Sequence, residues 1–352
     1  MDIETLNVVK VVTPTAISFF IGIAITPFVT GYLYKNKMWK KRAGKVAPDG
    51  KDTPIFNELH KHKEVGTPKM GGVIIWGSAL LTVIVLFLLA NFFPNETTEK
   101  LNFLSRNQTW LPIFTLIVGA IIGLVDDYLE VTGKADYIAG GLSLKKRLLV
   151  VLLVSIVGAW WFSTKLDTAI IVPFTGELEL GHLFMPFFVL VMLGVYSGGV
   201  IDGIDGLAGG VFAISFATYG AIAFSYSQID LAAFCFVLVG GLLAFLWFNI
   251  PPARFYMSET GSMSLTTSLA VVAFLTRQPL LLPIIAFPLL ATTLSDMIQI
   301  FSKKFRHKKV FLVAPIHHHF EAIGWPSYKV TMRYWIISIV FAIIGLIIVF
   351  IG

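Results

Sequence analysis

Long apolar runs separated by shorter polar segments dominate the chain. A membrane-spanning helix needs about 20 mostly apolar residues, and ten runs approach or exceed that length. These candidate spans cover residues 8–33, 71–93, 109–126, 147–164, 183–201, 206–226, 229–248, 260–276, 279–301 and 332–351. The pattern therefore predicts an all-α polytopic membrane protein with ten transmembrane helices, forming a single integral membrane domain over residues 1–352.

Two segments depart from the plain apolar pattern. The span at 260–276 is short and rich in Ser and Thr, so we expect it to pack inside the bundle rather than face lipid. Between residues 167 and 181, alternating polar and apolar positions flank Thr175-Gly176, which predicts a small β-hairpin. No inverted internal repeat of the kind found in many transporters is visible in the sequence.

Composition and charge add a membrane orientation. Hydrophobic residues make up 56% of the chain and charged residues only 14%, against about 25% charged in soluble proteins. The loops after odd-numbered spans hold 22 Lys and Arg, and the loops after even-numbered spans hold 4. Because cytoplasmic loops are enriched in Lys and Arg, loop 1 (35–69) and loop 9 (303–331) are predicted to be cytoplasmic. Both termini and the hairpin are then outside, and the net charge of +6 reflects topology rather than binding of nucleic acid.

Acidic and histidine residues gather at the predicted cytoplasmic ends of the spans. They are Asp126, Asp127, Asp202, Asp205, Glu259, Asp296, His317, His318, His319 and Glu321. A carboxylate near hydrocarbon is costly and usually serves a function. Their confinement to one face predicts a metal-assisted active site. The lone cysteine, Cys235, lies in an apolar run and gives neither an intrachain disulfide nor a zinc pattern.

Asp126 and Asp127 end an apolar run. Adjacent carboxylates raise each other's pKa unless a cation sits between them. An Asp at a helix C-terminus also opposes the helix macrodipole. A divalent metal, or the use of one carboxylate as a base, would account for the pair, and a solvated helix end is the alternative.

Three further segments carry candidate chemistry. The glycine-rich segment 197–206 offers Asp202 and Asp205 as hydrogen-bond acceptors or metal ligands, or Asp205 as a helix cap. The segment 249–262 offers an amide, an aromatic ring and a carboxylate, which suit a planar base beside a charged group, or else forms a helix-capping loop. The histidines at 317–319 lack zinc spacing and suit phosphate binding or acid catalysis, or else lie on the surface.

Two weaker signals involve backbone and basic residues. Residues 66–72 open a predicted helix, where backbone N–H groups can bind phosphate, although the ending of a P-loop is missing. The basic stretches 145–147 and 303–309 are more typical of anchors to anionic lipid than of ligand-binding residues.

Taken together, the motifs resemble the phospho-N-acetylmuramoyl-pentapeptide transferase family, within the polyprenyl-phosphate N-acetylhexosamine-1-phosphate transferases. The resemblance runs from the first span to the last. Its specific parts are GTPKMGG at 66–72, DDY at 126–128, GLS at 141–143, DGIDGLAGG at 202–210, WFNIPPA at 247–253, ETGS at 259–262 and APIHHHFE at 314–321.

The resemblance implies transfer of phospho-N-acetylmuramoyl-pentapeptide from its UDP carrier to undecaprenyl phosphate, with Mg²⁺ as cofactor and lipid I and UMP as products. It also implies a homodimer in the bacterial plasma membrane with its active site facing the cytoplasm. The implied catalytic residues are Asp126, Asp127, Glu259 and His317, of which the three carboxylates are the metal ligands. The implied nucleotide-binding residues are Asp202, Gly203, Asp205, Asn249, Tyr256, Gln299 and His318, and the phosphate-binding lysines are Lys63 and Lys134.

Four positions depart from the family's usual pattern. Glu259 stands where Asp is usual, Gly199 where Asn is usual, Tyr256 where Phe is common, and Glu130 where Lys is frequent. We expect metal-assisted phosphoryl transfer in which Asp126, or alternatively Asp127, activates the lipid phosphate. A covalent aspartyl intermediate stays open.

Two rival functions remain at this stage. A sibling enzyme would use UDP-GlcNAc in place of the muramoyl substrate. An ion-coupled transporter would place its charged residues near mid-membrane, whereas here they stop at one face.

Overall fold

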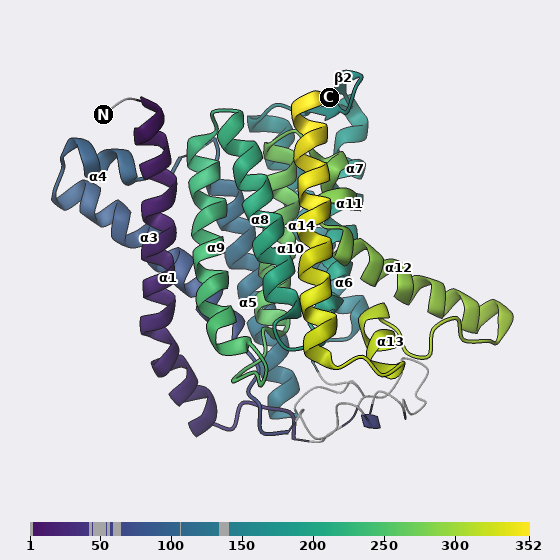
Figure 1. The fold of residues 1–352 in the computed structure, drawn as a ribbon. Coiled ribbons are helices and arrows are strands. Elements are labelled where there is room, and N and C mark those ends of the chain that lie inside the picture. The colour runs from purple at the N-terminus through teal and green to yellow at the C-terminus, as the bar shows by residue number, and fades with distance from the viewer. Residues whose placement is uncertain are drawn as a thin grey trace.

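The computed structural model describes residues 3–41, 44, 54, 57, 58, 65–105, 107–133 and 141–352. Long helices run side by side in a bundle (Figure 1). The α-helices are α1 (Ile3–Lys35), α3 (Gly72–Phe92), α4 (Glu96–Leu101), α5 (Trp110–Thr132), α6 (Leu144–Lys165), α7 (Phe184–Ser197), α8 (Leu207–Ser225), α9 (Ile229–Asn249), α10 (Ser258–Leu275), α11 (Leu282–Ile285), α12 (Phe287–Phe301), α13 (Ile316–Ala322) and α14 (Ser327–Ile351). Short 3-10 helices are η1 (Gly181–Leu183), η2 (Gly198–Ile201) and η3 (Pro279–Leu281), and η4 (Ser302–Arg306) is a short π-helix. The strands are β1 (Ala169–Val172) and β2 (Gly176–Glu179).

Within the described residues, 8 helices are long and apolar enough to cross a membrane. Seven of them are α1, α3, α5, α6, α8, α9 and α14. The eighth is the run Gly181–Ile201, of which α7 is the main part. A bent helix pair, Pro279–Ile285 with Phe287–Arg306, raises the number to 9 if it counts as one span. The predicted multi-pass helical architecture is therefore confirmed, while the number ten stays a prediction.

The run at 279–301 was predicted as one continuous span, and in the structure it is broken. Its two halves meet at an angle of 83°, and α12 projects sideways from the bundle (Figure 1). Pro288 lies in the first turn of α12, where the missing N–H costs nothing, although the same residue would interrupt a continuous helix. The hydrophobic content of this run concealed the break.

Helix α10 is the buried centre of the bundle, as its Ser and Thr content predicted. It packs against α5, and almost all of its residues are buried. Its hydroxyls find acceptors: Thr267 donates to the carbonyl of Thr115 at 3.1 Å and Ser268 to that of Pro112 at 2.9 Å. Such bonds satisfy polar groups that would be costly in an apolar interior.

The predicted hairpin is confirmed, with its turn placed slightly earlier than expected. Strands β1 and β2 are antiparallel and pair Val172 with Gly176, so the turn is formed by residues 173–175. Both chain ends and the hairpin lie at the same end of the bundle, and α13 lies toward the other end (Figure 1). An even number of crossings requires this arrangement of the termini, and the predicted placement of both termini outside rests on the charge distribution.

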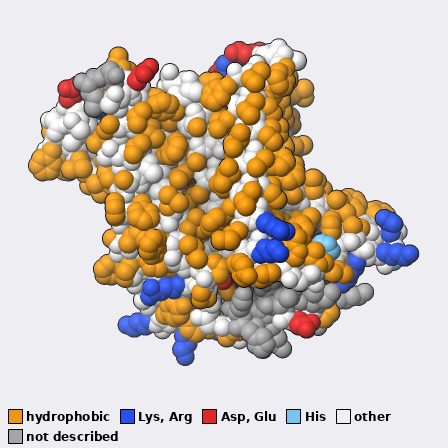
Figure 2. All heavy atoms as spheres, viewed as in Figure 1, with side chains coloured by type: hydrophobic (Ala, Val, Ile, Leu, Met, Phe, Trp, Pro, Cys, Tyr) orange, Lys and Arg blue, Asp and Glu red, His pale blue; other side chains and the backbone are white. Residues whose placement is uncertain are grey.

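Charged side chains are also separated between the two ends. Figure 2 shows Lys and Arg gathered over the lower half of the visible face, with Asp and Glu more frequent at the top. Between them lies a broad hydrophobic surface, as expected of a face in contact with lipid. The end that carries α13 is therefore the positive end on this face.

Candidate active site at the start of α10

Three consecutive residues at the start of α10 contact three other segments of the chain. The backbone N–H of Ser258 donates to Asp202 Oδ2 at 2.7 Å. Glu259 Oε1 lies 2.5 Å from Arg147 Nη1, and Thr260 binds Asp127. Residues that are far apart in the sequence thus meet at one helix N-terminus, where the helix macrodipole favours negative charge.

Asp127 is fixed by Thr260 and is fully buried. The Thr260 backbone N–H and hydroxyl both donate to Asp127 Oδ2, at 2.9 and 2.6 Å. The close approach depends on Gly123 of α5, because a side chain there would collide with the backbone of Glu259. The other oxygen, Oδ1, accepts no hydrogen bond from any described residue, and its nearest cation is Lys69 Nζ at 3.8 Å.

Asp126 is also buried; its Oδ1 accepts a hydrogen bond, and its Oδ2 accepts none from a described residue but is ion-paired. The Leu142 backbone N–H donates to Oδ1 at 2.5 Å, and Arg147 Nη2 lies 3.0 Å from Oδ2. Arg147 therefore bridges Asp126 and Glu259, and its Nε also donates to the Leu142 carbonyl at 3.0 Å. Helix α5 continues to Thr132 beyond the buried aspartates, so the alternative of a solvated helix end is wrong.

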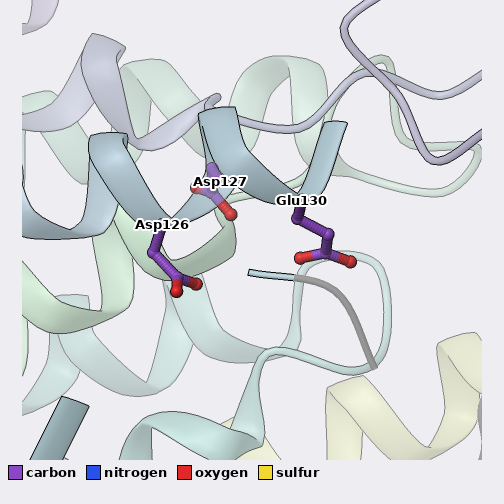
Figure 3. A group of neighbouring side chains, drawn as sticks. All are labelled: Asp126, Asp127 and Glu130. Atoms are coloured by element: carbon purple, nitrogen blue, oxygen red, sulfur yellow. The ribbon is translucent and has the colours of Figure 1, made fainter. Parts of the chain in front are cut away.

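Glu130 joins the pair from the next turn of α5 (Figure 3). One oxygen from each of Asp126, Asp127 and Glu130 lies within 4.8 Å of the others. Lys69 Nζ lies 2.5 Å from Glu130 Oε2. Burial lowers the pKa of the Lys69 ammonium, but the carboxylates of Glu130 and Asp127 raise it more, so the pKa lies above its ordinary value.

This carboxylate group fits a divalent metal of the Mg²⁺ type. Such ions prefer oxygen ligands, mainly carboxylates, and Asp127 Oδ1 is a buried oxygen without a hydrogen-bond donor among the described residues. The three carboxylates that lie together include Glu130, which was not among the predicted ligands, and the role of Glu259 as a metal ligand stays a prediction. Glu259 is joined to Asp126 through Arg147.

The segment 202–206 is held against the loop that follows α9. Asp205 Oδ2 accepts the backbone N–H of Ala253 at 3.1 Å, and the N-cap residue of α8 is Gly206, with no side-chain capping bond to the helix. The alternative of Asp205 as a helix cap is therefore wrong. Asn249 is buried and links the two loops: its Oδ1 accepts the Gly206 N–H at 2.9 Å, and its Nδ2 donates to the Phe255 carbonyl at 2.7 Å.

Tyr256 is only partly buried, whereas its neighbour Phe255 is fully buried. The Tyr256 N–H donates to the Pro68 carbonyl at 2.8 Å, and its carbonyl accepts the Gly71 N–H at 2.8 Å. The Gly72 N–H is likewise bound, to the Met257 carbonyl at 3.2 Å. The N–H groups of Gly71 and Gly72 are thus occupied, so for these two the predicted phosphate cradle is wrong.

His317 and His318 are buried, which excludes the alternative of a surface run for both. Their ring centroids lie 4.2 Å apart, and a side chain at Gly203 would collide with the Nε2 atoms of both rings. His318 Nδ1 forms a hydrogen bond of 2.8 Å with Glu321 Oε2. The glycine-rich segment and the histidines, predicted separately, therefore pack against each other at Gly203.

The remaining predicted residues fare differently. Gln299 is buried, and its side-chain oxygen accepts the backbone N–H groups of Val310 and Phe311, each at 3.0 Å. Its amide nitrogen donates to the Phe311 carbonyl at 2.9 Å, so the side chain braces the loop after α12. Lys63 and Lys134 lie outside the described residues.

The sequence hypothesis did not identify Arg147 and Lys69, which the described part of the chain places against the carboxylates of the site. Arg147 was grouped with neighbouring lysines as a lipid anchor, but Lys145 and Lys146 are exposed and Arg147 alone turns inward. The signal that could have revealed it is its place in the first turn of α6, directly after the GLS segment. Lys69 was visible only as one position in the GTPKMGG segment.

Comparison with known proteins matches this chain over nearly its whole length. Residues 109–277 match glycosyl transferase family 4. A phospho-N-acetylmuramoyl-pentapeptide-transferase of Caldanaerobacter subterraneus subsp. tengcongensis is 34% identical over 337 residues, covering 94% of this chain and 96% of the relative. Those of Listeria innocua, at 33% over 349 residues (98% and 99%), and Ruegeria sp., at 34% over 362 residues (97% and 94%), are similar.

Proposed function

The chain belongs to the phospho-N-acetylmuramoyl-pentapeptide-transferase family, and on that premise we propose that it transfers phospho-N-acetylmuramoyl-pentapeptide from UDP to undecaprenyl phosphate. UMP and lipid I are then the products, and the reaction is the first membrane step of peptidoglycan synthesis. The observation that carries this proposal is the meeting of Asp202, Arg147 and Asp127 at three consecutive residues of α10. A reaction between a nucleotide-linked diphosphate and a lipid phosphate acceptor needs polar and charged side chains from several segments at one place.

The uridine would be held by Tyr256 and Asp202. The Tyr256 backbone is fixed at both its N–H and its carbonyl, so little order would be lost when a base stacks on the ring. Asp202 is tied through Ser258 to the start of α10. His317 and His318, packed against Gly203, would then lie beside the diphosphate.

Asp126, Asp127 and Glu130, with Glu259 beyond Arg147, would hold Mg²⁺. When bound, Mg²⁺ neutralises charge on the diphosphate oxygens. Neither Asp127 Oδ1 nor Asp126 Oδ2 accepts a hydrogen bond from a described residue. Asp127 is the better candidate for orienting the acceptor or taking its proton, because Lys69 Nζ lies 3.8 Å from its Oδ1, whereas Arg147 Nη2 lies 3.0 Å from Asp126 Oδ2. Asp126, with one oxygen on Leu142 and the other on Arg147, would instead fix the position of Arg147.

The reaction follows as a direct displacement. An oxygen of undecaprenyl phosphate attacks the phosphorus bonded to the sugar, and the phosphoanhydride bond to UMP breaks. His317 would stabilise the charge on the phosphate oxygens. Thr260 keeps Asp127 in place throughout, because it holds the oxygen that faces away from Lys69.

We infer further that the site faces the cytoplasm of a bacterial cell and that the enzyme forms a homodimer. The gathering of Lys and Arg at the α13 end supports the orientation (Figure 2). Incubation of the purified enzyme with UDP-MurNAc-pentapeptide or with UDP-GlcNAc, followed by detection of UMP, tests the substrate assignment. UMP release with UDP-GlcNAc alone would identify the sibling activity instead.

A further inference from the structure

Among the described residues, Lys69 and Arg147 each lie against two carboxylates of the site. We propose that Lys69 and Arg147 are exchangeable counter-cations, which compete with a divalent ion in the substrate-free protein and make it enter together with the substrate's diphosphate. The proposal rests on the proposed transferase function. It adds that the divalent ion binds together with the diphosphate and not before it, and it attributes this order to Lys69 and Arg147.

Arg147 occupies the space between two carboxylates. Its Nη1 lies 2.5 Å from Glu259 Oε1 and its Nη2 lies 3.0 Å from Asp126 Oδ2. A guanidinium stays charged in proteins and cannot leave by losing its proton. A divalent ion that bound both Asp126 and Glu259 would therefore have to displace the guanidinium.

Lys69 plays the same part on the other side of the aspartate pair. Its Nζ lies 2.5 Å from Glu130 Oε2 and 3.8 Å from Asp127 Oδ1. The ammonium is thus placed beside the oxygen of Asp127 that accepts no hydrogen bond from the described residues. A metal ion bound at Asp127 and Glu130 would face this positive charge at short range.

The balance of charge favours joint entry of metal and diphosphate. Four carboxylates, Asp126, Asp127, Glu130 and Glu259, face Lys69 and Arg147, and Lys40 Nζ lies 3.9 Å from Glu130 as well. Four carboxylates against three cations leave one negative charge among these described residues, which is less than the two positive charges that a divalent ion added alone would bring beside the cations. A diphosphate brings negative charge of its own, so that the metal and both displaced cations each find an anionic partner.

Both side chains have the freedom to exchange partners. Each keeps 19% of its side-chain surface exposed, whereas Asp126 and Asp127 are fully buried and fixed by Leu142 and Thr260. The carboxylates form the rigid part of the site, and the long basic side chains are the part that moves.

Binding of Mn²⁺ to the purified protein without substrate, measured by electron paramagnetic resonance, tests the proposal. Lys69→Met and Arg147→Met should each raise the affinity for Mn²⁺ at least about tenfold, because a like charge within a few ångströms is removed. Lys41→Met and Lys146→Met are matched controls, since both residues are exposed, each is next in sequence to a cation of the site (Lys40 or Arg147), and each substitution removes one positive charge. The controls should leave the affinity within about twofold of the parent, because exposed charges are screened.

The charge-conserving variants Lys69→Arg and Arg147→Lys should bind Mn²⁺ as weakly as the parent. The parent protein supplies a test that needs no variant: UDP should raise its affinity for Mn²⁺, after correction for the complex of UDP with Mn²⁺ in solution. Tight Mn²⁺ binding by the parent without UDP, or Met variants that bind no better than the parent, would overturn the proposal. Because no turnover is measured, a failure to release UMP would count against the transferase function and leave this result intact.

Discussion

Thr260 donates both its backbone N–H and its hydroxyl to the same oxygen of Asp127, at 2.9 and 2.6 Å. The two bonds orient a fully buried carboxylate, so that its second oxygen points toward Lys69 and Glu130. The contact joins α5 to α10, and the small Gly123 permits it. The position of Asp127 is therefore set by tertiary packing rather than by its own helix alone.

Replacement of Thr260 by Val should lower kcat for UMP release by about 10- to 100-fold, the range expected for one hydrogen bond to a charged group. The KM for the UDP-sugar should change little, because Thr260 holds a group that acts on the acceptor. Thr260→Ser keeps the hydroxyl and should retain most of the activity. A Val variant as active as the parent would show that the hydroxyl bond to Asp127 is not needed, and a loss confined to Thr260→Ser would show that the methyl group matters instead.

Asp126→Asn and Asp127→Asn should each reduce turnover at least about 100-fold, the lower range for lost acid–base or electrostatic catalysis. The two variants should differ in binding, since Asp126→Asn also weakens the ion pair that holds Arg147. Steady-state kinetics and thermal unfolding of both variants supply the measurement. More than half of the parent activity in both would refute a catalytic role for the pair.

Apolar run length was enough to locate most of the helices, because a membrane crossing imposes its length directly on the sequence. The same signal could not show the break at residues 285–287, where proline placement redirects the chain. It also could not show that α10 lies at the centre, except through its Ser and Thr content.

The site was predictable in part. Asp126, Asp127 and Glu259 were each identified, and the structure brings them to the same place. Their cations were not identified, because the inward turn of Arg147 and the reach of Lys69 depend on how α6 and the start of α3 pack. Glu130 appeared in the sequence only as a departure from a family pattern, and the structure gives it Lys69 as a partner.

Tyr256→Ala should weaken binding of the UDP-substrate by about 1–3 kcal/mol, the range for stacking of a base on an aromatic ring. Tyr256→Phe is the matched control, since it keeps the ring, and it should bind nearly as the parent does. Isothermal titration with UDP and with undecaprenyl phosphate separates the two subsites. A fall in lipid affinity with unchanged nucleotide affinity would reverse their assignment.

Glu259→Gln should remove most of the activity, because it abolishes the charge that pairs with Arg147 and that would contribute to holding the metal. Glu259→Asp should retain measurable activity with a changed Mg²⁺ optimum, since the carboxylate is kept on a side chain shorter by one methylene. UMP release against Mg²⁺ concentration for the three proteins gives the comparison. A Gln variant that follows the parent curve would leave metal binding to Asp126, Asp127 and Glu130 alone.

The transfer reaction itself is tested most directly by measuring both products in one assay. The purified protein is incubated with UDP-MurNAc-pentapeptide, undecaprenyl phosphate and Mg²⁺. UMP is quantified by chromatography, and the lipid product is identified and quantified by mass spectrometry. UMP and undecaprenyl-diphospho-MurNAc-pentapeptide should appear in equal amounts, and neither should form without the lipid, without Mg²⁺ or with the Asp127→Asn variant. UMP without the matching lipid product, or no UMP from a folded parent protein under these conditions, would contradict the proposed function.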